Sequence, residues 1–300
     1  MLVTLKEILA DAEEYKYGVG LFNHLDLEMA NGIIEAAEEE GSPVILGVAE
    51  VHLSTIPFEY AATIMRKSAE QAKVPVCLHF DHGTDFAKIV KAMQSGFSSV
   101  MYDGSALPYE ENIANTREIS KVAHALGISV EAELGHVGGG EGGYDDGHEA
   151  MYTKVEQVND FITRADIDAL AVAIGTAHGE YKFTPKLDLN RLAQIYEVSD
   201  KPLVLHGGSG LSDDDFRNTI KNGIRKINIC TELCNAAYSS FAASKANGVN
   251  FEKAVIEARQ AVKNAVIRYM RVFGSSGRYK YTPYNPNKPY ISDEDMHYIF

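Results

Sequence analysis

The chain has 300 residues and a mass of 32.9 kDa, enough to bury a large core without disulfide bonds. It carries 28 Lys and Arg residues against 42 Asp and Glu residues, and this net charge of −14 argues against nucleic acid or an anionic membrane as a partner. No apolar run is long enough to span a membrane, and acidic residues interrupt the stretch where a signal peptide would be apolar. We therefore expect a cytoplasmic protein, in which Cys77, Cys230 and Cys234 are reduced thiols.

Short β-rich runs alternate with helical stretches along the chain. Thr4 and Glu7 have the spacing of a capping box, and they predict that a helix begins there. The predicted strands cover residues 18–22, 43–49, 76–80, 99–102, 129–133, 169–174, 202–205 and 225–229. The predicted helices between them cover residues 27–40, 56–71, 86–94, 110–126, 153–164, 190–198 and 213–222. This alternation predicts an α/β fold, a (β/α)8 TIM barrel, with a doubly wound parallel sheet as the alternative.

No break in this rhythm marks a second domain, so we expect one barrel domain over residues 1–278. From Tyr279 the composition changes to Tyr, Asn and Pro, which predicts a C-terminal tail or arm over residues 279–300. A glycine-rich acidic stretch at 138–147 follows the fifth predicted strand. Because barrel active sites lie at the carboxyl ends of the strands, we interpret this stretch as a mobile lid.

Most of the predicted strands end in a polar or ionisable side chain. These strand-end residues are Asn23, Asp81, His82, Asp103, Glu133, His178, His206 and Asn228. Because the carboxyl ends of barrel strands meet at one face, we expect these side chains to lie together. Three imidazoles, from His82, His178 and His206, favour a divalent transition metal, zinc first, with one position open for substrate.

Asp81 directly precedes His82, and adjacent residues of a regular strand point to opposite sides. Both reach one site if the chain bends, and Gly83 would permit that bend. A carboxylate beside a metal can exchange a proton with a substrate hydroxyl. Of the other histidines, His79 is expected in the core or behind a ligand, and His24 and His136 are candidates for the rim. The remaining four, His52, His124, His148 and His297, are expected at the surface.

Two neighbouring segments predict a phosphate site. Gly207, Gly208, Ser209 and Gly210 follow the seventh strand and lead into a helix, so backbone N–H groups meet a helix N-terminus. The eighth strand then delivers residues 228–231 beside them, and the loops after these two strands bind phosphate in many barrels.

These motifs, in this order, resemble the class II, metal-dependent ketose-bisphosphate aldolases of the fructose- and tagatose-bisphosphate type. The matching stretches include LHFDHG at 78–83, GTAHGEYK at 175–182, LHGGSG at 205–210 and INICTEL at 227–233, and the resemblance spans residues 1–278. It implies a lyase that splits a phosphorylated sugar, a ketose 1,6-bisphosphate, into dihydroxyacetone phosphate and glyceraldehyde 3-phosphate. It also implies a zinc ion, often a monovalent cation near the phosphate loops, and a dimer or tetramer.

The resemblance implies a role for each residue that matches the family's motifs. The three strand-end histidines would bind zinc, and Asp103 and Glu133 could hold a second or displaced ion. Asp81 would exchange the proton of the C4 oxygen, and Glu141 the proton on the dihydroxyacetone-phosphate carbon. The substrate-binding residues would be Asn23, Gly179, Lys182, Gly207, Gly208, Ser209, Asn228, Ile229, Cys230 and Thr231.

The match weakens at the far end of the substrate. Gly47 and Ala49 occupy positions where the family usually has a glutamine and a serine, and Glu252 stands where an arginine commonly grips the far phosphate. Since a carboxylate repels phosphate, either another cation takes over or the substrate is a ketose 1-phosphate with a different aldehyde half. Two further hypotheses are a metal-dependent barrel hydrolase and a non-catalytic partner subunit.

Overall fold

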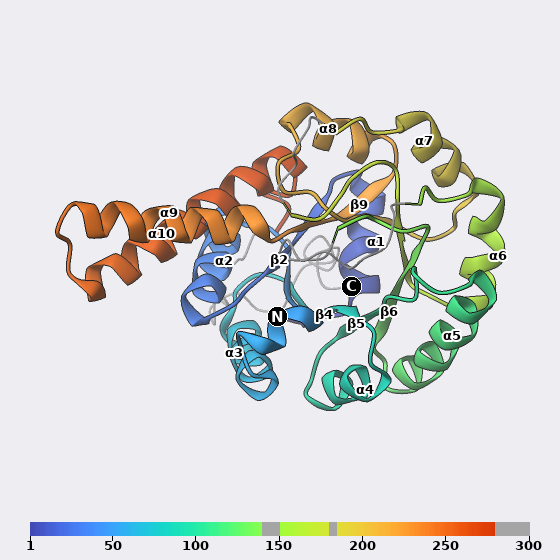
Figure 1. Ribbon diagram of the computed structural model, residues 1–300, viewed down its shortest axis with the longest axis horizontal. Helices are drawn as coiled ribbons and strands as arrows, with labels where there is room; N and C mark the ends of the chain where they lie inside the picture. The colour runs from blue at the N-terminus through green and yellow to red at the C-terminus, as the bar shows by residue number, and fades with distance from the viewer. Residues whose placement is uncertain (140–150, 180–184, 280–300) are drawn as a thin grey trace, which may run out of the picture.

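The computed structural model describes residues 1–139, 151–179 and 185–279, and these form a closed parallel barrel surrounded by helices (Figure 1). The barrel strands are β2 (Val19–Asn23), β3 (Val44–Ala49), β4 (Val76–Gly83), β5 (Ser99–Tyr102), β6 (Ser129–Leu134), β7 (Ala169–Val172), β8 (Leu203–Leu205) and β9 (Ile224–Ile229). They pair in the order β4-β3-β2-β9-β8-β7-β6-β5, and the β4–β5 pairing closes the ring. The predicted (β/α)8 barrel is confirmed, and the closure rules out an open doubly wound sheet.

A ninth, very short strand was not predicted. β1 (Leu2–Val3) pairs in parallel with the first residues of β4, opposite Val76 and Cys77. The neighbouring strand β5 joins β4 only from His79 onward, so β1 occupies the edge of β4 that β5 leaves uncovered. Two residues are too few for a period-2 pattern, which is why sequence periodicity does not reveal this strand.

Helices follow the strands around the ring. They are α1 (Leu5–Tyr15), α2 (Leu27–Glu40), α3 (Phe58–Gln71), α4 (Phe86–Gln94), α5 (Tyr109–Ala125), α6 (Val155–Ala165), α7 (Leu189–Val198), α8 (Asp213–Lys221), α9 (Thr231–Ala246) and α10 (Phe251–Phe273), with a short 3-10 helix η1 (Glu50–Ser54) after β3. The predicted capping box of Thr4 and Glu7 opens α1, and a second box of Ser212 and Asp215 opens α8. None of the described helices is both long and apolar enough to cross a membrane.

The interior of the barrel changes character along its axis. At the amino ends of the strands, apolar side chains such as Leu21, Ile45 and Val204 form a cluster with Leu5 and Leu9 of α1, which closes that end. Further along the same strands, the inward positions become polar: His79 and Asp81 on β4, Glu131 and Glu133 on β6, and Lys226 and Asn228 on β9 are all buried. Because alternate residues face the same side, each of these pairs points into the barrel. The fold thus places its polar interior at the carboxyl end.

Helices α9 and α10 form a hairpin that extends away from the barrel (Figure 1). The base of α10 packs on α2 and on the barrel, where Val262, Val266 and Met270 are buried. The α9 helix, in contrast, buries only Leu233 and Ser244 among its 16 residues. The tip of the hairpin therefore lies outside the core of this chain.

Candidate metal and substrate site

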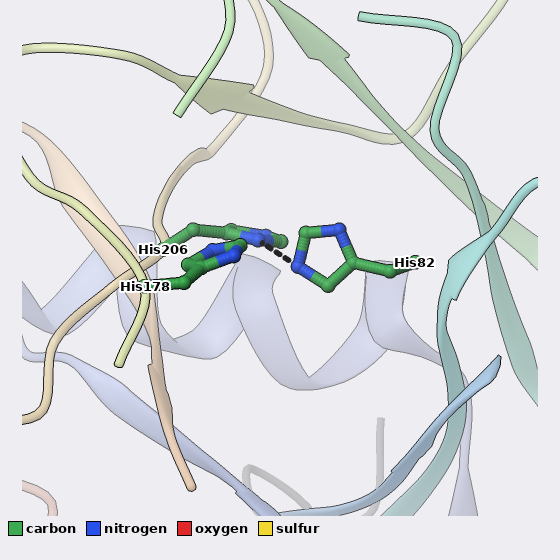
Figure 2. Close-up of side chains that lie close together, drawn as sticks. All are labelled: His82, His178 and His206. Atoms are coloured by element: carbon green, nitrogen blue, oxygen red, sulfur yellow. Dashed lines mark hydrogen bonds between the residues drawn. The ribbon is translucent and has the colours of Figure 1, made fainter. Parts of the chain in front are cut away.

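Three histidines, from the end of β4 and from the loops after β7 and β8, face one another at the carboxyl end of the barrel (Figure 2). The ring centroids lie 4.5 Å apart for His82 and His206, 4.8 Å for His82 and His178, and 5.8 Å for His178 and His206. Nε2 of His82 lies 2.7 Å from Nδ1 of His206. One nitrogen from each ring thus lies within 4.8 Å of the others, as the predicted metal site requires.

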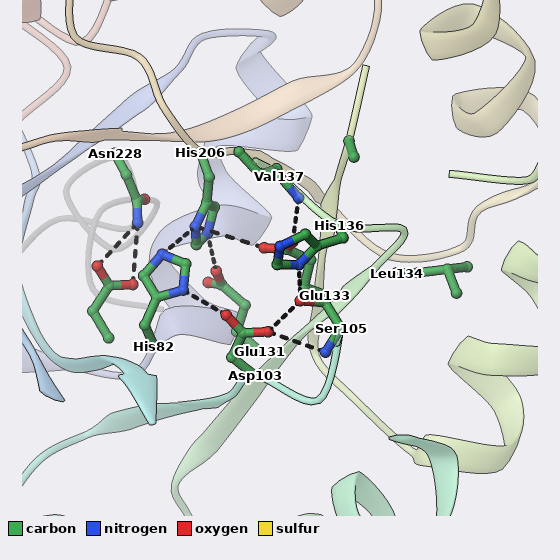
Figure 3. A network of polar contacts seen from close by, with 12 residues as sticks. His82, Asp103, Ser105, Glu131, Glu133, Leu134, His136, Val137, His206 and Asn228 are labelled. Atoms are coloured by element: carbon green, nitrogen blue, oxygen red, sulfur yellow. Dashed lines mark hydrogen bonds and ion pairs between the residues drawn. The ribbon is translucent and has the colours of Figure 1, made fainter. Parts of the chain in front are cut away.

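A carboxylate stands behind two of these rings (Figure 3). Nδ1 of His82 lies 2.8 Å from Asp103 Oδ2, and Nε2 of His206 lies 2.9 Å from Glu131 Oε1. A carboxylate accepts a hydrogen bond, so the nitrogen it contacts carries the proton and the other nitrogen keeps its lone pair. This arrangement is typical of metal-binding histidines, whose distal N–H is commonly held by a carboxylate.

Glu133 gives independent support for a cation. Its Oε1 accepts a hydrogen bond from the Val137 amide at 2.8 Å, while its buried Oε2 has no hydrogen-bond partner among the described residues. Burial, with the nearby charge of Asp103, raises the pKa of Glu133 to about 8. Oxygens of Glu133 and Asp103 and a nitrogen of His82 lie within 4.8 Å of one another, forming a second group with the donors of a metal site. The residues present therefore fit a divalent ion.

The bend that lets Asp81 and His82 share one site lies at His82 itself. Its backbone has φ +47°, in the left-handed region, and the β4–β5 register shifts between Phe80 and Gly83. Gly83, which was expected to permit the bend, lies at the end of this register shift and does not itself have a positive φ. Gly83 instead permits close packing, since a Cβ there would lie 2.7 Å from both Ile89 and the Met101 carbonyl oxygen.

Asp81 is fully buried and is held by two amides. Asn23 Nδ2 donates to its Oδ2 at 2.9 Å, and Asn228 Nδ2 donates to its Oδ1 at 3.1 Å. Burial alone would raise the pKa of this carboxyl, but the charges of His82 and Lys226 hold it well below its usual range. Asp81 is therefore an ionised acceptor, fixed in orientation beside the three imidazoles.

Sequence reasoning missed a buried polar network that involves Lys226, Glu131 and His79. Lys226 Nζ lies 2.6 Å from Glu131 Oε2 and 3.4 Å from Nε2 of His79. Glu131 uses its other oxygen for His206, so it links the buried lysine to a candidate metal ligand. The sequence does carry a signal for this network. Glu131 lies two residues before Glu133, and Lys226 lies two residues before Asn228, so each shares the inward face of its strand with a predicted site residue.

The predicted phosphate loops are brought together. Gly207 has φ +64°, and a Cβ there would lie 2.4 Å from the Ala177 carbonyl oxygen, so the segment before Gly179 runs close to this turn. The Gly208 amide donates to the Asn228 carbonyl oxygen at 3.2 Å. The Glu232 amide, in the first turn of α9, donates to Ser209 Oγ at 3.4 Å. The loops after β7 and β8 thus adjoin the junction of β9 and α9, which is formed by Ile229, Cys230 and Thr231.

Several histidines differ from expectation. His52, expected at the surface, is buried, and its Nε2 lies 3.8 Å from Cys230 Sγ. His24 and His136 are also buried rather than on the rim: His24 Nδ1 contacts the Gly47 carbonyl oxygen at 2.9 Å, and His136 Nδ1 contacts Ser105 Oγ at 2.8 Å. His79 is in the core, as expected, and contacts Ser99 Oγ at 2.8 Å.

Two predicted functional residues lie outside the described residues. These are Glu141, in the glycine-rich stretch, and Lys182. The three positions that differ from the family pattern, Gly47, Ala49 and Glu252, lie within the described residues. A Cβ on Gly47 would lie 2.5 Å from Asn23 Oδ1, so this position has no room for a side chain while Asn23 keeps its place. Ala49 is buried, and Glu252 is exposed in the first turn of α10, on the hairpin.

Comparisons with known proteins agree with this fold. The model of the family "fructose-bisphosphate aldolase class-II" matches residues 3–278. The fructose-bisphosphate aldolase of Geobacillus stearothermophilus is 41% identical over 285 residues, covering 92% of this chain and 98% of that protein. The crystal structure of the YdjI aldolase from Escherichia coli K12 has a TM-score of 0.85 at 38% identity, covering 93% of this chain and 100% of that one. A putative fructose-1,6-biphosphate aldolase from Coccidioides immitis has a TM-score of 0.82 at 31% identity, covering 91% and 97%.

The barrel and its strand-end side chains are those of a barrel enzyme, and the matches define its class as an aldehyde-lyase. The chain belongs to the class-II fructose-bisphosphate aldolase family. Enzymes of this class are in general metal-dependent, and the described residues offer groups that suit an ion.

Proposed function

We propose that this enzyme uses zinc, held by His82, His178 and His206, to split a ketose 1,6-bisphosphate of the fructose or tagatose type. The products are dihydroxyacetone phosphate and glyceraldehyde 3-phosphate. The observation that carries this proposal is the meeting of three imidazoles with a buried, doubly hydrogen-bonded Asp81 at the carboxyl end of the barrel. Asp103 and Glu133 are proposed to hold a second or displaced ion.

In the proposed reaction, the C3–C4 bond of the ketose breaks. The bound ion supplies a Lewis acid that polarises a carbonyl oxygen. Asp81 accepts the proton of the C4 hydroxyl, so that C4 and its oxygen become the carbonyl of the departing aldehyde. The electron pair of the broken bond stays on C3, next to the C2 carbonyl, and a proton delivered to C3 completes dihydroxyacetone phosphate. We assign that last transfer to Glu141, by resemblance to the family.

The amides around Asp81 support its proposed role as the base, and the glycine loops support the proposed phosphate site. Asn23 and Asn228 fix both carboxylate oxygens of Asp81, which pre-orients the base. Asn228 Oδ1 is buried without a hydrogen-bond partner among the described residues, and so it can accept a bond from a substrate hydroxyl. We propose that Gly179, Lys182, Gly207, Gly208, Ser209, Ile229, Cys230 and Thr231 hold the phosphate of the dihydroxyacetone half, with a monovalent cation nearby.

A second candidate substrate is a ketose 1-phosphate whose aldehyde half lacks a phosphate. Two observations favour it: Glu252 is an exposed carboxylate, and Gly47 is closely packed against Asn23 and cannot carry a polar side chain without displacing it. Asp81 would act in the same way on this substrate, because the C3–C4 bond and the C4 hydroxyl are the same in both sugars.

The experiment is an assay for release of dihydroxyacetone phosphate from four substrates: fructose and tagatose 1,6-bisphosphates and the two corresponding 1-phosphates. We expect cleavage of at least one of the two sugars. The ratio of kcat/KM between its bisphosphate and its 1-phosphate then shows whether the enzyme recognises a phosphate on the aldehyde half. An Asp81→Asn variant, nearly isosteric, is the matched control, and it should lose about 10²- to 10⁴-fold in kcat while still binding metal. Failure of the metal-loaded enzyme to cleave any of the four would contradict the proposed reaction on these sugars.

We also propose that the enzyme is a cytoplasmic homo-oligomer, a dimer or tetramer. On the α9–α10 hairpin, Tyr238 is 76% exposed and Phe251 79% exposed. Phe241 and Phe251 line a groove of about 250 Å³ that also contacts Leu27 and Met29 of α2. Large aromatic side chains on a projecting hairpin favour coverage by a second copy of the chain. The barrel domain is proposed to end near residue 278, with 279–300 as a separate tail or arm.

A further inference from the structure

A second cavity lies at the opposite end of the barrel from the three histidines. Its volume is about 480 Å³, and it is lined by Lys16, Tyr196, Arg217, Ile220, Lys221, Arg225, Val272, Phe273 and Gly274. Lys16 directly follows α1, Tyr196 lies near the end of α7, and Arg225 is the second residue of β9. These positions belong to the amino ends of the strands, whereas the candidate active site is at their carboxyl ends.

The lining of this cavity is strongly cationic. Four of its residues are Lys or Arg and none is Asp or Glu, in a chain whose net charge is −14. Three carboxylates outside the lining neutralise part of this charge: Glu13 pairs with Lys16 and Arg225, and Arg217 pairs with Asp214 at 3.0 Å and with Asp213 at 3.6 Å. Lys221 has no ion-pair or hydrogen-bond partner for its ammonium group among the described residues. The cavity therefore keeps an excess of positive charge.

Arg225 is a built component of this cavity rather than a surface side chain. It is 1% exposed, its Nε donates to Glu13 at 2.6 Å, and its Nη1 donates to the carbonyl oxygens of Ile220 and Ile224 at 2.8 Å. Within the described part of the chain, Nη2 has no acceptor. A buried guanidinium with one nitrogen left unpaired is suited to an anionic ligand.

The rest of the lining is apolar and fixed in place. The Tyr196 hydroxyl donates to Glu13 and accepts from Lys16 at 2.9 Å, and its ring centroid lies 5.6 Å from the Arg225 guanidinium carbon. Gly223 has φ +109°, and a Cβ there would lie 2.3 Å from the Tyr196 ring, so glycine is needed for this packing. Ile220, Val272 and Phe273 complete an apolar surface beside the cations.

We propose that this cavity binds a phosphomonoester of about the size of a sugar phosphate. The volume lies within the usual range of small-molecule sites, roughly 300–1,000 Å³. The phosphate would contact Lys221, Arg217 and Nη2 of Arg225, because guanidinium and ammonium groups are the preferred phosphate donors. The organic part would rest on Tyr196 and the apolar wall. The site is independent of the proposed aldolase reaction, since none of its residues belongs to that machinery.

The test is lysine footprinting of the full chain with an acetylating reagent, read by mass spectrometry, with glucose 6-phosphate as the probe. We expect the acetylation rates of Lys16 and Lys221 to fall several-fold, while that of Lys67, an exposed lysine on α3, stays unchanged. Glucose, and potassium chloride at matched ionic strength, should give no protection. Inorganic phosphate should protect less, because it cannot use the apolar wall.

An Arg217→Gln/Lys221→Gln variant supplies the specificity control, with Lys16 as its reporter. Both side chains are on the outer part of α8, so the variant should retain aldolase activity. Retained activity would show that the variant is folded. Protection of Lys16 should be lost in this variant and kept in a matched Lys67→Gln variant. Protection no greater at Lys16 and Lys221 than at Lys67, or protection that persists in the double variant, would overturn the proposal.

Discussion

Glu131 links a candidate metal ligand, His206, to the buried Lys226. One oxygen holds the His206 ring at 2.9 Å, and the other pairs with the ammonium group of Lys226 at 2.6 Å. Burial alone would raise the pKa of Glu131, but Lys226 and His206 lower it to about 2. The carboxylate is therefore ionised, and it orients a candidate metal ligand.

A Glu131→Gln variant should separate these two effects. Loss of the carboxylate behind His206 should weaken zinc affinity by about 10- to 100-fold. Loss of the partner of Lys226 should cost about 3–5 kcal/mol of the free energy of unfolding, because the buried ammonium is left uncompensated. Zinc affinity is measured by competition with a chelating dye, and stability by urea denaturation of the metal-free protein.

The control is the double variant Glu131→Gln/Lys226→Met. Removing both charges should restore most of the stability, while zinc affinity stays low because His206 still lacks its carboxylate. Zinc affinity at the wild-type level in either variant would show that Glu131 does not position a metal ligand.

For single residues, the sequence predicts site side chains at strand ends better than site side chains inside strands. His82, His178 and His206 follow apolar runs, and the barrel places them together. Glu131 and Lys226 lie within the strands, where only a period-2 comparison with Glu133 and Asn228 would have found them. The left-handed backbone of His82 has no signal in the sequence, because that conformation depends on the surrounding packing and not on residue type.

Helix α1 is the element that closes the apolar end of the barrel, and Glu13 ties it to β9. Glu13 accepts a hydrogen bond from the buried Arg225 at 2.6 Å and also contacts Lys16 and Tyr196. Burial on its own would raise the pKa of Glu13, but the bonds from Lys16 and Tyr196 and the charge of Arg225 lower it below its usual value. The ionised carboxylate thus stabilises the contact between α1 and β9.

A Glu13→Gln variant should lose about 2 kcal/mol of the free energy of unfolding at pH 7, the usual contribution of a hydrogen bond to a charged group. Because the folded-state pKa is lowered, the wild-type contribution is present above the unfolded value near 4.5 and is lost as pH falls through the folded value. The difference between wild type and variant, measured by urea denaturation, should therefore shrink between pH 7 and pH 3.

The matched control is Glu118→Gln, which removes an exposed pair with Lys121 on α5. Such pairs contribute little, so its stability should stay within about 0.5 kcal/mol of wild type at both pH values. An equal loss in both variants would mean that the Glu13–Arg225 contact has no special role.

Periodicity and capping motifs located the elements, and packing decided their ends. The capping box of Thr4 begins α1 as predicted, and α8 begins at Asp213, where the sequence predicted a helix start. Strand β4 was predicted to end at Phe80 but runs to Gly83 through the register shift. Strand β7 ends at Val172, two residues earlier than predicted. These ends depend on pairing with neighbouring strands, which a single run of residues does not encode.

The whole molecule has two ends of different character. The amino end of the barrel is filled by apolar side chains and closed by α1. The carboxyl end carries buried charged side chains and the glycine loops. The hairpin of α9 and α10 projects to one side, with exposed aromatic side chains. Periodicity predicted the ring, but the projection depends on helix length and direction, which the residue pattern does not specify.

A Tyr238→Ser/Phe251→Glu variant should disrupt the proposed oligomer. Both side chains are more than three-quarters exposed in the single chain, so the substitutions should leave the fold of the barrel unchanged. Light scattering coupled to size-exclusion chromatography should show an oligomer for wild type and a monomer for the variant. A matched Tyr60→Ser variant, on α3 and 68% exposed, should keep the oligomer. A wild-type monomer, or an unchanged oligomer in the double variant, would contradict this interface.

A zinc titration of the chelator-treated enzyme, with release of dihydroxyacetone phosphate as the readout, tests whether the reaction depends on a metal ion. We predict no cleavage without metal and a rate that rises with added zinc until about one equivalent per chain is bound, as expected for one catalytic ion at three imidazoles. A metal-free enzyme that cleaves the same sugar phosphate at the full rate would contradict this prediction.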